Sequence, residues 1–392
     1  MIDRAEARPR LAMDASAWCG SRGLGRYAVQ MAIALAHSGE LELVPCTHSD
    51  RWGPWTIPPE LAEKTLVWHS SHLPWSSLRM PLLARRCRPQ AVWFPANEAA
   101  TWGCQPYILT LNDVAQAHYP EKFFARVRDH EHYLTRLKSA VARAARLVTI
   151  SDYSRRDIAA VTGCSVEQIA MIPLGVDPVF RPVPAEESGR VRRALELEGP
   201  YLLYVGGYDF RKNLERLIEA FALLCSRGHR ETLVLVGSGG ANQRVYPDLR
   251  ASATRYGVSN RVRFLEGTVG DDLTLRALYN GASVFVFPSL FEGFGLPPLE
   301  AMACGTPVVC STAAALPQVV GEAAVQVDPE DAEGMAQAVA RVLDDEELRG
   351  RLRAAGRDRA AGYTWAGAAA QFLRLAWQPV AGRCGRKATT AT

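Results

Sequence analysis

The chain has 392 residues, more than one hydrophobic core usually supports, so we expect two domains. Its formal net charge of +4 is small and both signs are well mixed, which argues against nucleic acid as a partner. No apolar run approaches the roughly 20 residues needed to span a bilayer, and residues 1–16 carry acids without a secretory apolar core. We therefore expect a cytoplasmic protein.

Cysteine and histidine spacing gives no sign of a metal site. The nine cysteines are scattered without a C-x-x-C pair, which is typical of buried, reduced thiols. The pairs His69/His72 and His130/His132 lack a second cluster at metal-ligand spacing. We expect no structural or catalytic metal.

The first half of the chain alternates strand-like and helix-like stretches. Helices are expected at 21–39, at 123–145 and after the polar residues 151–154. Strands are expected at 10–16, 41–47, 65–69, 91–95, 107–111 and 147–150. This alternation favours an α/β fold with a parallel, doubly wound sheet.

A glycine pair lies at the start of the first expected helix. Gly23 and Gly25, with Ala28, loosely fit the pattern that lets a backbone approach phosphate, although tight packing produces the same pattern. A nicotinamide site also needs an acid closing the second strand, and residues 44–47 (VPCT) have none. A nicotinamide-dependent oxidoreductase is therefore the weaker alternative.

Asn112 and Asp113 close an expected strand, so their side chains should face the ligand crevice of the sheet. A turn-forming Asn-Asp pair explains the same two residues equally well. Both interpretations stay open from the local pattern.

Residues 69–89 mix apolar side chains with arginines, and prolines are expected to break any helix there. An apolar face beside a basic cluster can contact an anionic membrane surface. A solvated arginine patch is the commoner outcome, so peripheral contact with the cytoplasmic face of the inner membrane is the minority interpretation.

The Pro-rich stretch 172–182 reads as an extended linker between the two halves. A charged helix at 186–198 and a buried strand at 201–205 follow, and then a loop carries Arg211 and Lys212 ahead of a helix at 214–228. Two cations at the carboxyl end of a strand suit a diphosphate, although basic residues near loops are often merely solvated. Asn213 and the glycines beside them favour the phosphate interpretation.

Residues 288–309 (PSLFEGFGLPPLEAMACGTPVV) form a second candidate for the same site. An apolar strand at 284–287 precedes them, Pro297 and Pro298 suit a helix start, and Gly305 suits its end. The expected helix dipole favours an anion, and the carboxylates of Glu292 and Glu300, the latter in the first helical turn, can accept hydrogen bonds from sugar hydroxyls. The remaining strands are expected at 233–236, 262–267 and 323–329, with helices at 271–282 and 335–378.

Taken together, these stretches resemble glycosyltransferase family 4. The resemblance rests on VGGYDFRKN at 205–213, the stretch 284–309, AAVQVDPED at 323–331 and YTW at 363–365. It implies the GT-B fold, with two doubly wound Rossmann-like domains facing each other across a cleft. The implied parts are an acceptor-side domain at 1–178, a nucleotide-sugar domain at 179–364, a helix at 365–380 packing back on the first domain, and a disordered tail at 381–392.

The resemblance also assigns roles to residues of this chain. It implies that Arg211 and Lys212 hold the donor diphosphate, that Glu300 binds the ribose and that Glu292 contacts the transferred sugar. Backbone N–H groups of Phe294, Gly295 and Leu296 would reach sugar or phosphate, while Gly23 and Gly25 would let a loop of the first domain close on the phosphates. Members of the family need no metal or other cofactor.

One residue departs from the family pattern, because Asn112 stands where relatives often have His before Asp113. Asn cannot carry a proton at neutral pH, so the departure favours a different donor such as a 6-deoxy sugar. The expected function is retaining transfer of a hexose, by default mannose from GDP-mannose, to a glycan or polyprenyl-linked acceptor in bacterial polysaccharide synthesis. The alternatives are a dTDP-rhamnose or UDP-sugar donor, a phosphorylase-like enzyme, or a degenerate module that binds nucleotide sugar without turnover.

Overall fold

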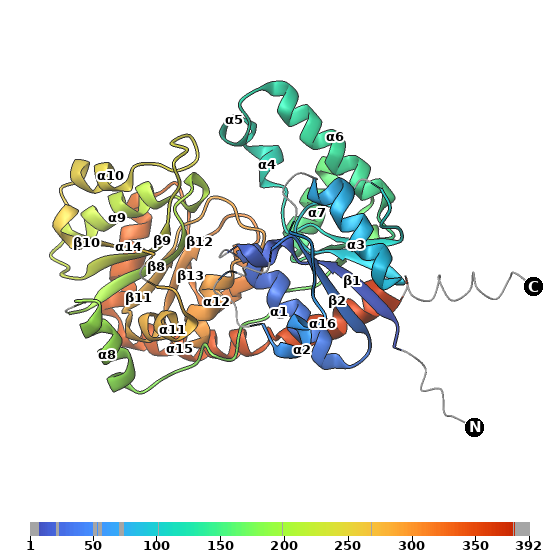
Figure 1. Ribbon diagram of the computed structural model, residues 1–392. Helices are drawn as coiled ribbons and strands as arrows, with labels where there is room; N and C mark the ends of the chain where they lie inside the picture. The colour runs from blue at the N-terminus through green and yellow to red at the C-terminus, as the bar shows by residue number, and fades with distance from the viewer. Residues whose placement is uncertain are drawn as a thin grey trace, which may run out of the picture. The chain divides into compact units, whose positions relative to one another are not determined.

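The computed structural model describes residues 8–20, 23–49, 53, 57–69, 74–100, 102–197, 199–267, 269–378 and 380. Within them the chain forms two compact units (Figure 1). The first unit contains the described residues up to Gly175 and those from Thr364 onwards, and the second is Val176–Tyr363. The sequence predicts that the first domain ends at residue 178 and the second at residue 364. The predicted disordered tail at 381–392 lies outside the described residues.

The first unit is built on a seven-stranded parallel sheet in the order β3-β2-β1-β4-β5-β6-β7. Its strands are β1 (Arg10–Asp14), β2 (Glu42–Thr47), β3 (Leu66–Val67), β4 (Ala91–Phe94), β5 (Tyr107–Thr110), β6 (Arg146–Thr149) and β7 (Ile169–Met171). Its helices and helical turns are η1 (Ser16–Cys19), α1 (Gly23–Ser38), α2 (Pro59–Ala62), η2 (Trp75–Arg79), α3 (Met80–Cys87), α4 (Ala115–His118), α5 (Pro120–Phe123), α6 (Val127–Arg143), α7 (Asp152–Thr162), η3 (Val166–Gln168), α16 (Trp365–Phe372) and η7 (Leu373–Trp377).

The second unit is built on a six-stranded parallel sheet in the order β10-β9-β8-β11-β12-β13. Its strands are β8 (Tyr201–Gly207), β9 (Thr232–Ser238), β10 (Val262–Glu266), β11 (Val284–Phe287), β12 (Val308–Ser311) and β13 (Val325–Val327). Its helices and helical turns are α8 (Ala185–Ala194), η4 (Phe210–Lys212), α9 (Leu214–Ser226), α10 (Leu249–Arg255), η5 (Ser259–Arg261), α11 (Asp272–Gly281), α12 (Leu296–Ala303), α13 (Leu316–Val320), η6 (Gly321–Ala323), α14 (Ala332–Asp344) and α15 (Glu346–Ala361). Two parallel, doubly wound sheets confirm the predicted α/β class.

The C-terminal helix α16 packs on α1 of the first unit. The ring of Trp365 lies 6.4 Å from that of Tyr27, and the ring of Phe372 lies 4.9 Å from that of Trp93. A Cβ at Gly175 would come within 2.2 Å of the Trp365 backbone N, so only glycine fits where the chain leaves the first unit. The last helix is therefore part of the core of the first unit.

Two local expectations were wrong in the first unit, and one strand was missed. The helix expected at 123–145 is α6 and begins only at Val127, because Phe124 and Arg126 are extended after the short helix α5. Proline does not prevent a helix in the arginine-rich stretch, since Pro81 lies in the first turn of α3, where a missing N–H costs little. The short strand β7 was not predicted at all.

No helix in the described part of the chain is long and apolar enough to cross a bilayer.

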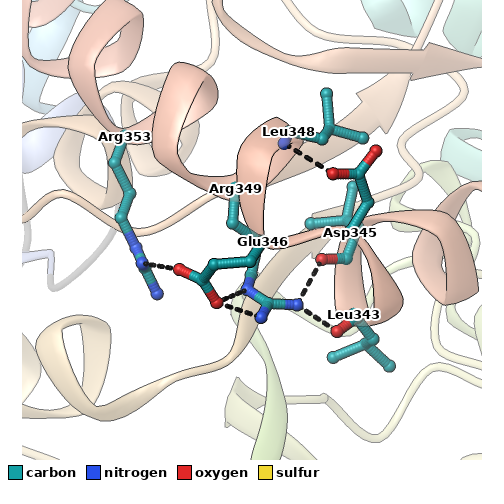
Figure 2. Close-up of polar contacts among 7 residues, drawn as sticks. Leu343, Asp345, Glu346, Leu348, Arg349 and Arg353 are labelled. Atoms are coloured by element: carbon teal, nitrogen blue, oxygen red, sulfur yellow. Dashed lines mark hydrogen bonds and ion pairs between the residues drawn. The ribbon is translucent and has the colours of Figure 1, made fainter.

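Helix ends in the second unit are set by backbone conformation and by local polar contacts. The helix expected at 186–198 ends at Ala194, because Glu196 adopts a left-handed backbone with φ of 53°. At the junction of α14 and α15, the Asp345 carboxylate accepts from the Leu348 N–H at 2.9 Å, which caps α15 (Figure 2). Arg349 donates to the last carbonyls of α14 and pairs with Glu346.

The carboxyl ends of β8 and β9 approach each other too closely for side chains. Gly237 has φ of +153°, and a Cβ placed there would lie 1.8 Å from the Gly206 carbonyl oxygen. This contact lets both strands run on to the loops that follow them.

We expect Gly237→Ala to destabilise the second unit by on the order of 3 kcal/mol, because β8 and β9 would have to separate. Urea unfolding followed by circular dichroism measures the loss. Gly239→Ala is the matched control, since a Cβ there meets only atoms about 3.9 Å away and φ is not positive. Equal stability of the two variants would contradict the close-approach argument.

Candidate functional site

The candidate site of the second unit lies where the strand order of its sheet reverses. Strands β8, β9 and β10 extend to one side, while β11, β12 and β13 extend to the other, so β8 and β11 are neighbours at the reversal. Parallel α/β sheets bind ligands in the crevice at the carboxyl ends of such a pair. Arg211 and Lys212 follow β8, and Glu292 follows β11.

The loop after β8 is fixed by one asparagine. Asn213 has a left-handed backbone with φ of 58° and ends the turn η4 that carries the two cations. Its Nδ2 donates to the Pro288 carbonyl at 3.2 Å and to the Pro329 carbonyl at 2.7 Å. Leu290 N–H also donates to the Arg211 carbonyl at 2.7 Å. The loops after β8, β11 and β13 are thereby joined by hydrogen bonds.

Lys212 and Glu292 form an ion pair between the two loops. The distance between Nζ and Oε1 is 2.6 Å, and the two side chains are only 14% and 13% exposed. The ammonium also lies 5.7 Å from the centre of the Phe287 ring, within the range of a cation–π interaction. Residues 80 positions apart in the sequence are thus brought together at the predicted diphosphate site.

Arg211 is paired within its own loop. Its Nε donates to Asp209 Oδ1 at 2.8 Å, and Asp209 is 5% exposed. Burial alone would raise the pKa of the Asp209 carboxyl, but the charges of Arg211 and Lys212 and the hydrogen bonds from Arg211 outweigh it and lower the pKa below its usual value. Asp209 therefore stays ionised and orients the guanidinium.

The stretch between β11 and α12 is shaped by a glycine. Gly295 has φ of +111° and precedes the first residue of α12, and a Cβ there would lie 2.6 Å from Leu316 Cδ2. Phe294 is buried against the Tyr363 ring at 5.7 Å, and Leu296 begins the helix. These contacts fix the backbone that the sequence assigned to sugar or phosphate. Gly305, with φ of +78°, follows the helix end as expected.

Glu300 lies deeper in α12 than expected. The prediction put it in the first helical turn, but the helix begins at Leu296 and its first turn holds no acid. Glu300 is 4% exposed, and its Oε2 accepts from the Tyr279 hydroxyl at 3.0 Å. Thr306 in turn donates to the Tyr279 carbonyl at 2.6 Å, so α11 orients this carboxylate.

The predicted residues of the first unit divide into two pairs. Gly23 and Gly25 lie in the first turn of α1, within the helix expected at 21–39. A Cβ at Gly23 would meet nothing within 4 Å, so the fold of this unit does not itself require glycine at that exposed helix start.

Asn112 uses its amide group inside the first unit. Its Nδ2 donates to the Pro95 carbonyl at 3.1 Å, and its backbone N–H donates to Asn97 Oδ1 at 2.6 Å. Asp113 Oδ1 accepts from the Ala115 N–H at 3.1 Å and so orders the turn before α4. Asn112 therefore joins the loop after β4 to the end of β5.

Among the described residues, no three His, Cys, Asp or Glu side chains are grouped so that they could hold a metal ion. The charges at the reversal point are instead two cations and their carboxylate partners. Such a site can bind a diphosphate through Arg211 and Lys212 and hydroxyl groups through its carboxylates.

Family models match both halves of the chain. The model described as Glycosyltransferase Family 4 matches residues 21–180, and the model described as Glycosyl transferases group 1 matches residues 187–359. The chain belongs to glycosyltransferase family 4. This hexosyltransferase is 29% identical over 375 residues to the O-antigen chain mannosyltransferase B of Escherichia coli. The aligned region covers 90% of this chain and 94% of the relative.

Solved structures show that the glycosyltransferase has the predicted GT-B fold. Sucrose-phosphate synthase from Thermosynechococcus elongatus superposes with a TM-score of 0.74 at 23% identity and covers 98% of this chain and 100% of that one. HepE from Anabaena in complex with UDP-glucose superposes with a TM-score of 0.69 at 17% identity, over 97% of this chain and 99% of that one.

Two residues of the glycosyltransferase site were missed by sequence reasoning. Asp209 lies two residues before Arg211 in the same loop, and that spacing of opposite charges was a signal that could have been used. Tyr279 had no local signal, because its hydroxyl meets Glu300 only once α11 and α12 are packed.

We expect Asp209→Asn to destabilise the enzyme at pH 7 by about 2 kcal/mol, the usual cost of losing a hydrogen bond between charged groups. Because folding lowers the pKa of Asp209, its stabilisation is complete above its ordinary pKa of 3.8 and disappears as the pH falls through the lower folded value. Urea unfolding at pH 7 and at pH 3 should therefore show a smaller difference between wild type and variant at pH 3.

Asp358→Asn, at an exposed position of α15, is the control for loss of a surface charge. It should leave the stability unchanged at both values of pH. A destabilisation by Asp209→Asn that is the same at pH 7 and pH 3 would contradict an ionised, paired Asp209.

Proposed function

We propose that this glycosyltransferase transfers a hexose from a nucleotide diphosphate sugar to a hydroxyl of a glycan or lipid-linked acceptor, with retention of the anomeric configuration. The observation that carries the proposal is the Lys212–Glu292 pair at the reversal point of the sheet, 2.6 Å long and beside Arg211. It combines diphosphate-binding cations with a carboxylate that can accept from sugar hydroxyls.

The proposed chemistry needs stabilisation of the leaving group. The glycosyl–phosphate bond breaks, the sugar becomes oxocarbenium-like, and negative charge grows on the departing diphosphate. Arg211 and Lys212 would stabilise that charge, and fixed donors of this kind are usually the largest contribution to catalysis. The acceptor oxygen attacks from the same face, and the leaving phosphate takes its proton. We propose that no metal takes part, because the two cations supply the positive charge.

Mannose from GDP-mannose is the donor that we favour. The relative matched over 94% of its length is an O-antigen chain mannosyltransferase, which supports mannose and a role in bacterial surface polysaccharide synthesis. The UDP-glucose complex of HepE supports a nucleotide-sugar donor in this fold. We propose that the enzyme works at the cytoplasmic face of the inner membrane, where a polyprenyl-linked acceptor would be held.

A 6-deoxy sugar such as the rhamnose of dTDP-rhamnose is the second candidate donor. It is favoured by Asn112, whose Nδ2 donates to the Pro95 carbonyl at 3.1 Å inside the protein. At neutral pH neither the Asn112 amide nor the Pro95 carbonyl can take up or release a proton, as a histidine at this position could. An enzyme with Asn here would depend less on a hydroxyl at carbon 6.

We expect Lys212→Ala and Glu292→Ala each to reduce transfer by on the order of a hundredfold or more, because each removes a group that contacts the reacting part of the donor. Release of nucleoside diphosphate in the presence of acceptor measures the rate. Glu219→Ala is the matched control, since Glu219 forms an ion pair of the same 2.6 Å length with Arg216 on the surface of α9. Full activity of either site variant would overturn the site assignment.

The donor is identified by thermal-shift measurements with GDP, UDP and dTDP and with GDP-mannose, UDP-glucose and dTDP-rhamnose. A ligand at a hundred times its dissociation constant adds about 2.7 kcal/mol of stability, which gives a clear shift. We expect GDP-mannose to give the largest shift. Preference for dTDP-rhamnose would select the second candidate, and NADH shifting the protein while every nucleotide sugar fails would reject the glycosyltransfer proposal.

A further inference from the structure

We propose that the Lys212–Glu292 ion pair makes the donor site selective for the intact nucleotide sugar over the nucleoside diphosphate product. When the nucleotide sugar binds, its diphosphate replaces Glu292 as the partner of Lys212. Its sugar then supplies hydroxyl donors to the released carboxylate. The inference rests on the proposed function and adds a specificity role to a residue so far treated only as a sugar contact.

The first step is that a diphosphate and Glu292 compete for the same cation. Nζ and Oε1 are 2.6 Å apart, and both side chains are more than four-fifths buried. Separating a buried pair is costly unless each charge finds a new partner, because neither regains full hydration. The oxygens of the diphosphate can replace the carboxylate on Lys212, so the cation keeps a charged partner when the ligand binds.

The residues around Lys212 can hold its ammonium group in position while its partner changes from Glu292 to the diphosphate. The Phe287 ring lies 5.7 Å from Nζ and comes from the buried strand β11. The other carboxylate of the loop, Asp209, is bound to Arg211 at 2.8 Å. The exchange at Lys212 is therefore between Glu292 and the ligand.

The released carboxylate of Glu292 then needs a donor. Its backbone carbonyl accepts from the Ala315 N–H at 3.3 Å, so the loop can stay in place while the side chain turns. The neighbouring phenol Tyr204 donates its hydroxyl to the Gly207 carbonyl at 2.7 Å. Burial, and next the charge of Glu292, raise the pKa of Tyr204, so it stays neutral and bound to that carbonyl. The hydroxyl groups of the transferred sugar can donate to it.

The two ligands therefore differ in what they satisfy. A nucleoside diphosphate replaces Glu292 on Lys212 but brings no sugar hydroxyl to the released carboxylate, whereas a nucleotide sugar supplies partners to both groups. The pair lowers the affinity for the product without lowering that for the substrate. Release of the product after transfer is favoured for the same reason.

The test compares wild type and Glu292→Gln by calorimetric titration with three ligand pairs: GDP and GDP-mannose, UDP and UDP-glucose, dTDP and dTDP-rhamnose. Gln keeps the shape of the side chain and removes the charge that holds Lys212. We expect the variant to bind the matching nucleoside diphosphate about tenfold more tightly than wild type, with little preference left for the sugar-bearing form. Glu219→Gln, at the surface pair with Arg216, should change neither affinity.

A second measurement needs no variant. In wild type, the free hexose of the matching donor should strengthen binding of the nucleoside diphosphate, because it supplies hydroxyls to Glu292. Unchanged affinities in Glu292→Gln, or independent binding of hexose and nucleoside diphosphate in wild type, would overturn the inference while leaving the proposed function intact. If wild type binds none of the three pairs, the proposed function fails and this inference fails with it.

Discussion

The candidate site depends on one ion pair between loops that follow adjacent strands. Lys212 follows β8 and Glu292 follows β11, and these strands are neighbours because the order of the parallel sheet reverses between them. Every parallel strand ends at the same edge, so the reversal leaves a crevice in which charged side chains from both loops meet. The pair joins a cation suited to phosphate with a carboxylate suited to hydroxyls.

The surrounding structure holds that pair in position without regular secondary structure. Asn213 and the Leu290 N–H join the loops by hydrogen bonds to backbone carbonyls. Gly295, between Glu292 and α12, occupies a backbone position where a side chain would overlap Leu316. Buried loops must satisfy their polar backbone groups, and here side chains and close backbone contacts do so. The same contacts fix the distance between the cations and the carboxylates.

Much of the fold could be predicted because its signals are local. Apolar runs such as 201–205 and 284–287, followed by glycine-rich loops, indicate buried parallel strands, and both strands are present. The errors occur where the backbone is decided by geometry rather than composition. Glu196 turns left-handed and ends α8 early, and Phe124 and Arg126 are extended, so that α6 begins later than its apolar pattern predicts. The short strand β7 forms only because β6 offers it an edge.

By itself the sequence determined the class, the family and the residue types of the site, because glycine, proline and charge positions follow each strand in a recognisable order. The tertiary structure decided which of those residues meet. It paired Lys212 with Glu292, Arg211 with Asp209 and Glu300 with Tyr279, and it used Asn112 to join two loops. The pairing of Lys212 with Glu292 spans 80 positions and depends on strand order and loop closure, and local sequence patterns show neither.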